Sequence, residues 1–354
     1  MIGLMQRQPL LTSMALRHAA GHHRGAEIVS RLDDGSLHRT NYAAVEVRAR
    51  RLARVLQELG VRQGDRVATL AMNGHRHLEL YYAITGIGAI YNTINPRLAR
   101  DDIAYIVNHA EDRVLFADAG FAPLLAGIAP RIASVTQEIV LLAAPAEMPP
   151  LELPAGMRLH AYEALLAAAE PIPMWPDLDE NGACGLCYTS GTTGRPKGVL
   201  YSHRSTILHA MMMTMADTAA LRAVDRAMPV VPMFHVNAWG LPFAAPMAGT
   251  SLVLPGRQLD PASLIELLDA ERVTISGGVP TVWLGVIGKL REERGRLTTL
   301  ERIMSGDRRT PPKMVRAPGA FGRRDPAARR HRQAAQDRAA RTVRRGAERS
   351  TRTQ

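Results

Sequence analysis

Apolar residues up to position 306 recur at two spacings, one typical of helices and one of buried strands. Helical spacing predicts a helix that Gly60 ends and a second one that begins at Asp260-Pro261. This alternation is typical of parallel sheets covered by helices on both faces, so the sequence predicts an α/β fold of layered αβα subdomains. Further elements are expected as follows: a helix near 77–85, strands at 67–72, 88–92, 114–117, 139–143, 252–254 and 273–275, and surface connections at 144–150 and 171–176.

Basic residues are unevenly distributed along the chain. The net charge is +11, and the whole excess lies in residues 307–354, because residues 1–306 carry as many acidic as basic side chains. The last stretch also lacks Leu, Ile, Trp and Tyr, so it cannot bury enough apolar surface to offset the entropy of ordering. We therefore expect a folded core over 1–306 and an Arg/Ala/Pro-rich, disordered tail over 307–354.

Residues 188–199 have the pattern of a phosphate-binding loop. Glycines let backbone amides approach an anion, hydroxyl groups add neutral donors, and Lys197 adds a positive charge. The apolar runs on either side predict a strand entering the loop and a strand leaving it. This is not a Walker loop, because Pro196 precedes the lysine and Gly198 takes the place of the hydroxyl that would hold Mg²⁺. A solvated linker is the alternative interpretation.

A second segment, residues 229–242, places prolines and aromatic residues around His235 and Trp239. Taken alone, His235 could equally be a structural histidine and Trp239 a core residue. Together, however, the two segments resemble the adenylate-forming (acyl-activating) superfamily, and the second resembles its medium- and long-chain fatty acyl-CoA synthetases. The resemblance covers roughly residues 10–306, the N-terminal portion of such enzymes. Three shorter stretches agree with it: 60–67, 92–97 and 277–283.

The resemblance implies a fatty acid–CoA ligase that uses ATP to convert a fatty acid into acyl-AMP and then into acyl-CoA. Lys197 and His235 would be catalytic, with His235 beside the reacting carboxylate. Trp239 would close the fatty-acid tunnel, and Gly278 would lie in the stretch that lines the acyl pocket. The residues implied to bind the nucleotide are Thr189, Ser190, Gly191, Thr192, Thr193, Gly194 and Lys197.

Later motifs of the superfamily cannot be located in this sequence. They supply a glutamate for Mg²⁺, an aspartate for the ribose and, on a mobile C-terminal domain, a lysine for adenylation. The family pattern breaks at 307–310, returns at 311–317 and then stops, so we hypothesise a frameshift that the coding DNA would reveal. A genuine basic tail that neutralises nucleic-acid phosphates is the alternative. Because that tail lacks interleaved aromatic residues, we expect no nucleic-acid partner.

Cysteine and histidine positions do not indicate a metal or redox site. Cys184 and Cys187 lie in the strand predicted before the loop, where buried thiols are expected. The pairs His22-His23 and His75/His77 are expected at the surface, so no metal ligands are predicted. Two cysteines, no signal peptide and no membrane-spanning apolar run favour a cytoplasmic location. The chain could assemble as a homodimer.

We predict that this chain, without the later motifs, has no appreciable ligase activity. Pyrophosphate release from decanoate or palmitate, ATP and CoA measures this, and a rate typical of the family would contradict the prediction. The rival interpretations are a pseudoenzyme that binds nucleotide without turnover, an aryl-CoA ligase, and a nucleic-acid-binding protein that acts through its basic tail.

Overall fold

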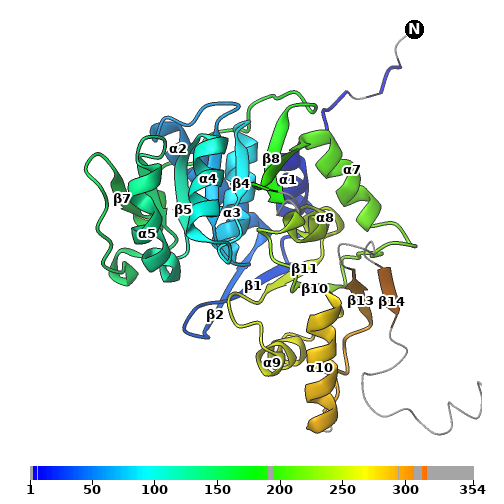
Figure 1. Ribbon diagram of the computed structural model, residues 1–354. Coiled ribbons are helices and arrows are strands. Elements are labelled where there is room, and N and C mark those ends of the chain that lie inside the picture. Colours follow the sequence, from blue (N-terminus) through cyan, green and yellow to red (C-terminus); the bar gives the residue numbers. More distant parts are fainter. Residues whose placement is uncertain (1–2, 6, 190–193, 294, 307–312, 317–354) are drawn as a thin grey trace, which may run out of the picture.

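The computed structural model describes residues 3–5, 7–189, 194–293, 295–306 and 313–316. These residues form two seven-stranded sheets, which Figure 1 shows one above the other. The first sheet has the order β7-β6-β5-β3-β4-β8-β9 and is parallel except for the antiparallel pair β8 and β9. Its strands are β3 (Arg66–Leu70), β4 (Ile90–Thr93), β5 (Asp112–Ala117), β6 (Glu138–Leu141), β7 (Arg158–Ala161), β8 (Ala183–Thr189) and β9 (Lys197–Ser202).

The second sheet has the order β14-β13-β12-β10-β11-β1-β2, with antiparallel strands at both edges and parallel strands between them. The predicted parallel sheets are therefore present, but each ends in at least one antiparallel strand. The strands are β1 (Glu27–Arg31), β2 (Leu37–Asn41), β10 (Arg226–Pro229), β11 (Ser251–Leu254), β12 (Ile275–Gly278), β13 (Arg302–Ser305) and β14 (Lys313–Arg316).

Helices cover both faces of both sheets, and the two sheets share the middle layer. Helices α4 and α5 pack on the outer face of the first sheet, and α9 and α10 on the outer face of the second (Figure 1). Helices α1, α2, α3, α6, α7 and α8 contribute to the core between the sheets. The helices are α1 (Thr12–His22), α2 (Tyr42–Glu58), α3 (His75–Gly86), α4 (Arg100–Ala110), α5 (Ala122–Ile132), α6 (Tyr162–Ala168), α7 (His203–Met213), α8 (Leu241–Ala248), α9 (Pro261–Ala270) and α10 (Pro280–Glu292).

Short turns of 3₁₀ helix complete the fold: η1 (Ala119–Phe121), η2 (Pro145–Glu147) and η3 (Val236–Gly240). The strands follow the expected alternation of faces. In β5, Val114 and Phe116 belong to the middle core, whereas Leu115 and Ala117 belong to the outer core beneath α4 and α5. Both faces of the sheets are thus apolar, which is why the strands appear in the sequence as short continuous apolar runs.

Helix α3 lies in the centre of the middle layer, and every residue in it except Arg76 is buried. Its polar groups therefore need partners within the protein. The hydroxyl of Tyr81 donates to the carbonyl of Met233, and that of Tyr82 to the carbonyl of Pro242, each over 2.6 Å. Both carbonyls belong to the segment that follows β10, so α3 joins the first sheet to the second.

The expectation that His75 and His77 are surface residues is wrong. Their exposed fractions are 4% and 1%, because both lie on α3. His77 donates from Nδ1 to the Met72 carbonyl over 3.0 Å, so its Nε2 accepts from the Thr69 hydroxyl, also over 3.0 Å. His75 stacks on the ring of His38. Polar neighbours in the sequence are no guide to exposure when a helix is enclosed by two sheets.

The predicted surface connection at 171–176 is also partly buried. Ile172 and Trp175 belong to the middle core, and the Trp175 indole covers the end of α3. A Cβ atom at Gly86 would lie 2.2 Å from that indole, so only glycine leaves room for it. The prolines of this stretch suggested a surface connection, and its two buried side chains, Ile172 and Trp175, were therefore not predicted as core residues.

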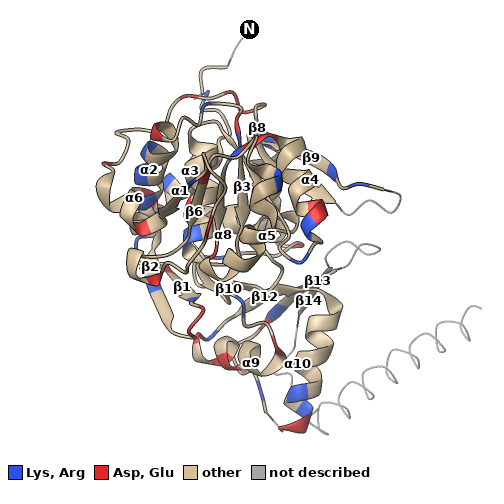
Figure 2. Cartoon of the chain, turned by 60° about the vertical axis from the view of Figure 1, so that its left-hand side comes forward, with Lys and Arg blue, Asp and Glu red and all other residues tan. Residues whose placement is uncertain are grey.

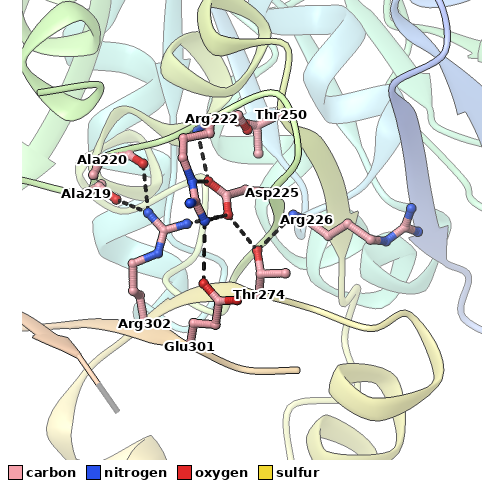
Figure 3. Close-up of polar contacts among 9 residues, drawn as sticks. All are labelled: Ala219, Ala220, Arg222, Asp225, Arg226, Thr250, Thr274, Glu301 and Arg302. Carbon is pink, nitrogen blue, oxygen red and sulfur yellow. Dashed lines mark hydrogen bonds and ion pairs between the residues drawn. The ribbon is translucent and has the colours of Figure 1, made fainter. Parts of the chain in front are cut away.

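The second sheet is held at the amino ends of its strands by a buried carboxylate, Asp225 (Figure 3). It accepts hydrogen bonds from the backbone and guanidinium of Arg222, from Arg302 in β13, and from the Thr274 hydroxyl. Arg302 also donates to the carbonyls at 219–220. Burial alone would raise the pKa of Asp225, but the hydrogen bonds from the two arginines outweigh it and lower that pKa. This cluster fixes β10, β12 and β13 relative to one another.

The structure describes four residues of the predicted tail, 313–316, as strand β14, which pairs with β13. At these residues it differs from the expected disorder. The rest of the tail, including the position of the hypothesised frameshift, lies outside the described residues. Within the described ranges, no helix is both long and apolar enough to span a bilayer.

We predict that His77 makes the stability of the fold depend on pH. Burial lowers the pKa of His77 to about 4, below its ordinary value of 6.5. The unfolded chain therefore binds a proton at a higher pH than the folded one, so this contribution is complete above about pH 6.5 and is lost as the pH falls towards about 4. Urea unfolding across this range should show a smaller pH dependence for His77→Gln than for the wild type. Equal slopes would contradict the assignment.

Candidate functional site

The carboxyl ends of the parallel strands from the two sheets lie side by side, and Asn73 joins them. Asn73 follows β3 and is buried. Its amide nitrogen donates to the carbonyls of Pro229 (2.8 Å) and Val231 (3.0 Å), and its oxygen accepts from the Met233 amide (2.6 Å). Ligands of α/β proteins bind at the carboxyl ends of strands. The candidate site is therefore this junction between β3, β4 and β8 on one side and β10 and β12 on the other.

The predicted phosphate loop connects β8 to β9, as the sequence indicated. Residues 190–193, which include four of the predicted nucleotide ligands, lie outside the described residues. Of the others, Thr189 is exposed and its hydroxyl donates to the Lys197 carbonyl over 3.5 Å. Gly194 has a φ of +139°, which other residues rarely adopt. Lys197 is exposed at the start of β9, and no acidic side chain in the described ranges pairs with it.

Helix α4 braces the base of this hairpin. The guanidinium of Arg195 lies over the Tyr105 ring, 5.0 Å from its centre. The Tyr188 hydroxyl and Nδ1 of His109 share a hydrogen bond of 2.7 Å, and burial raises the pKa of Tyr188 to about 12, which keeps it protonated. No pattern in the sequence pointed to Tyr105 and His109, because they reach the loop only through the packing of α4.

A left-handed turn follows His235, and sequence reasoning missed it. Residues 236–240 of η3 all have positive φ values, between 47° and 77°. Each non-glycine residue in this conformation costs roughly 1–2 kcal/mol, and the β-branched Val236 is especially unsuited to it. His235 itself is exposed, and its backbone amide donates to the Pro232 carbonyl over 3.0 Å. Such strain persists only where neighbouring groups enforce it.

Helix α7 supplies one of those neighbours. His209 lies 3.1 Å from the Trp239 carbonyl through Nε2, and its ring covers Gly240. A Cβ atom at Gly240 would lie 2.5 Å from that ring. Gly240 is thus required both for its positive φ and for the space that His209 occupies. Helix α7 continues directly from β9, so the same helix is joined to the β8–β9 hairpin and packs against the turn.

The two glycines of β12 face opposite cores. A Cβ atom at Gly277 would lie 3.5 Å from the half-buried indole of Trp239, on the side of the middle core. A Cβ atom at Gly278 would instead lie 3.2 Å from Trp283, which packs beneath α10 and donates to the Gly278 carbonyl. The Cα–Cβ direction at the predicted pocket residue Gly278 therefore points towards Trp283, whereas at Gly277 it points towards Trp239.

The structure adds Arg97 to the candidate site. This exposed residue follows β4, and its guanidinium lies 5.8 Å from the centre of the Phe234 ring, next to His235 in the chain. It places a cation at the junction of the two sheets. The stretch 92–97 was notable in the sequence only for its resemblance to a family, so no role was predicted for this arginine.

The described part of the hairpin does not fit Mg²⁺. Its residues at the loop, Thr189 and 194–197, include no carboxylate, the ligand that this ion takes from proteins alongside water and phosphate oxygens. Among the described residues as a whole, no group of three or more His, Cys, Asp or Glu could hold a metal. Figure 2 shows basic and acidic segments interspersed over the elements in view.

A family model described as "AMP-binding enzyme" matches residues 16–326. The chain is 47% identical over 318 residues to a 3-methylmercaptopropionyl-CoA ligase of Ruegeria pomeroyi, covering 89% of this chain and 58% of that protein. It is 46% identical over 321 residues to a medium-chain-fatty-acid–CoA ligase of Ectopseudomonas oleovorans, covering 89% and 57%. The chain thus spans somewhat more than half the length of these curated relatives.

The fold is similar to that of an anthranilate CoA ligase, AuaEII, solved in complex with anthranoyl-AMP. The TM-score is 0.74 at 22% identity, over 85% of this chain and 55% of the other. At this identity the match supports the architecture of the two sheets and no more.

We predict that valine at 277 and at 278 has different effects, although the two positions are adjacent. Gly277→Val would extend into the space of Trp239, which is half-buried on a strained turn and so can move. Gly278→Val would press on Trp283 in a closed core and should cost about 1–3 kcal/mol of stability. Trp239 emission, obtained by subtracting the spectrum of a matched Trp239→Phe variant, should change only with Gly277→Val. The same emission change in both variants would refute the opposite orientation.

Proposed function

The chain belongs to the AMP-binding enzyme family, and on that premise we propose that it is the nucleotide- and acid-binding part of a fatty acid–CoA ligase. The position of Lys197 supports this most directly. Lys197 is an exposed cation at the start of β9 and pairs with Thr189 at the carboxyl end of β8, so the glycine- and hydroxyl-rich loop runs from one of these residues to the other. Phosphate groups need amide donors, hydroxyls and a cation together, and this hairpin has all three.

In this proposal the hairpin binds the β- and γ-phosphates of ATP. The ligands would be the loop amides and hydroxyls together with the Lys197 ammonium. Because a carboxylate must approach a polyanion, the cations that flank the junction, Lys197 and Arg97, would neutralise charge as the two reactants meet. His235 directly follows Phe234, whose ring the Arg97 guanidinium covers, so it belongs to the same junction, a suitable place for the carboxylate of the acid.

The proposed reaction has two steps. An oxygen of the carboxylate attacks the α-phosphorus of ATP and pyrophosphate leaves, which gives acyl-AMP. The sulfur of CoA then attacks the acyl carbon, its proton passes to solvent, and AMP leaves with the C–O bond electrons. In the whole enzyme, Mg²⁺ would assist the first step by neutralising phosphate charge. The roles proposed for the described residues do not depend on Mg²⁺.

The proposed substrate is a medium- or long-chain fatty acid. Trp239 packs against the middle core, and both Trp239 and Met304 lie next to Gly277; these apolar surroundings suit an alkyl chain rather than a polar acid. One relative is named for medium-chain fatty acids, in agreement with this proposal. A cytoplasmic location and assembly as a homodimer remain predictions from the sequence. Nucleotide binding without turnover, as in a pseudoenzyme, is the alternative function.

We predict that the purified chain binds ATP and that Lys197→Ala weakens this binding roughly ten- to a hundredfold, the size expected for losing a hydrogen bond to a charged group. Titration calorimetry with ATP measures the affinities. Lys289→Ala is the matched control, because Lys289 pairs with Glu293 on the remote helix α10. If the wild type binds no ATP, or if the two lysine variants bind alike, the proposed nucleotide site is refuted. Because the later motifs of the family cannot be located in this sequence, no pyrophosphate release is expected from the chain, and ATP binding without turnover would separate a nucleotide-binding protein from a nonfunctional fragment.

A further inference from the structure

We propose that Asn237 is a positioning residue that ties strand β8, which leads into the phosphate loop, to the turn that carries His235 and Trp239. Through it, a displacement of the β8–β9 hairpin on nucleotide binding would reach the turn. The inference deepens the proposed function and rests on it for the identity of the ligand. The contact between Asn237 and β8 is present in the protein without ligand.

The side chain of Asn237 is buried and lies against β8. Its Oδ1 is 3.3 Å from the sulfur of Cys187, two residues before Thr189 in that strand. The Tyr81 hydroxyl also lies 3.3 Å from this oxygen, but it is only 2.6 Å from the Met233 carbonyl. A hydroxyl has one proton, and the shorter bond takes it. The thiol of Cys187 is therefore the principal donor to Asn237.

Cys187 is suited to this role because it stays protonated. Burial raises the pKa of its thiol, against opposing hydrogen bonds from Thr93 and from the backbone amides of Asn237 and Val236. The same amides place the sulfur against the backbone of the turn as well as its side chain. The strand thus contacts the turn at residues 236 and 237, the first two of its left-handed run.

The strain of the turn makes this contact consequential. Four consecutive non-glycine residues hold left-handed conformations, each of them unfavourable without support. Asparagine tolerates this conformation better than most residues, but its neighbours Val236 and Ala238 do not. An element held against its own strain by a few contacts is free to shift when one of those contacts moves. Such elements transmit binding at one site to another.

Hydrogen exchange of residues 232–240 in the full chain, without ligand, tests the contact. Asn237→Gly removes the side chain but keeps a residue that adopts positive φ freely, so it isolates the hydrogen bond from backbone strain. Cys187→Ala removes the donor from the other side. Each should raise exchange in this segment about fivefold, as expected for one buried hydrogen bond. Cys187→Ser, which restores a donor, should recover most of the protection.

Cys184→Ala is the matched control. Cys184 lies in the same strand and is equally buried, but its sulfur contacts the Thr206 hydroxyl on α7 instead of the turn. Exchange at 232–240 should stay at the wild-type level in this variant. If Asn237→Gly and Cys187→Ala leave the exchange unchanged, or if Cys184→Ala raises it equally, the assignment of Asn237 is overturned.

Saturating ATP tests the transmission. In the wild type, ATP should change exchange at 232–240, and in Asn237→Gly this response should fall to a small fraction. A full response in Asn237→Gly would overturn the inference while leaving the nucleotide site intact. If ATP does not bind the wild type, the proposed function fails, and the ligand-free exchange still decides whether Asn237 holds the turn.

Discussion

Enclosing helix α3 between two sheets is the constraint on which the rest of the structure depends. A helix buried on all sides has no water to satisfy its polar groups, so each one must find a partner in the surrounding layers. Glu79, with no exposed surface, is paired with Arg48 over 2.7 Å and with the Tyr162 hydroxyl over 2.6 Å. Removing one partner of such a buried pair typically costs about 3–5 kcal/mol. The orientation of α3 is therefore closely specified.

The same constraint positions the candidate site. Asn73, just before α3, and Tyr81, within α3, hydrogen-bond to the backbone that follows β10. Tyr81 also stacks on Tyr91 of β4, so this backbone and the first sheet share a neighbour. The left-handed turn after His235 lies between two of these anchors, the carbonyls of Met233 and Pro242. The hydrogen bonds that satisfy these buried polar side chains thus also hold together the junction at which strands of both sheets end.

The sequence was informative where a local pattern of residue types is enough to indicate a structural element. Apolar runs predicted strands where the structure has β3, β4, β5, β6, β8, β9, β11 and β12, but no strand was predicted at β1, β2, β7, β10, β13 or β14. The loop pattern placed Lys197 in the connection between two strands that the structure shows as β8 and β9. It failed where a residue's role depends on a distant layer. His77 looked polar and exposed, Trp175 sat in a proline-rich stretch, and Arg97 meets Phe234 only through packing. No local pattern indicates a left-handed run through Val236, since its cause lies in other elements.

Adjacent glycines that serve different cores have a consequence for how such a protein can diverge. Variation at Gly277 changes the surroundings of Trp239 while leaving the packing of α10 intact, whereas variation at Gly278 disturbs α10 and leaves Trp239 alone. In the proposed function, a change at the first position would therefore alter the surroundings of the acyl chain, and a change at the second would alter the stability of the fold.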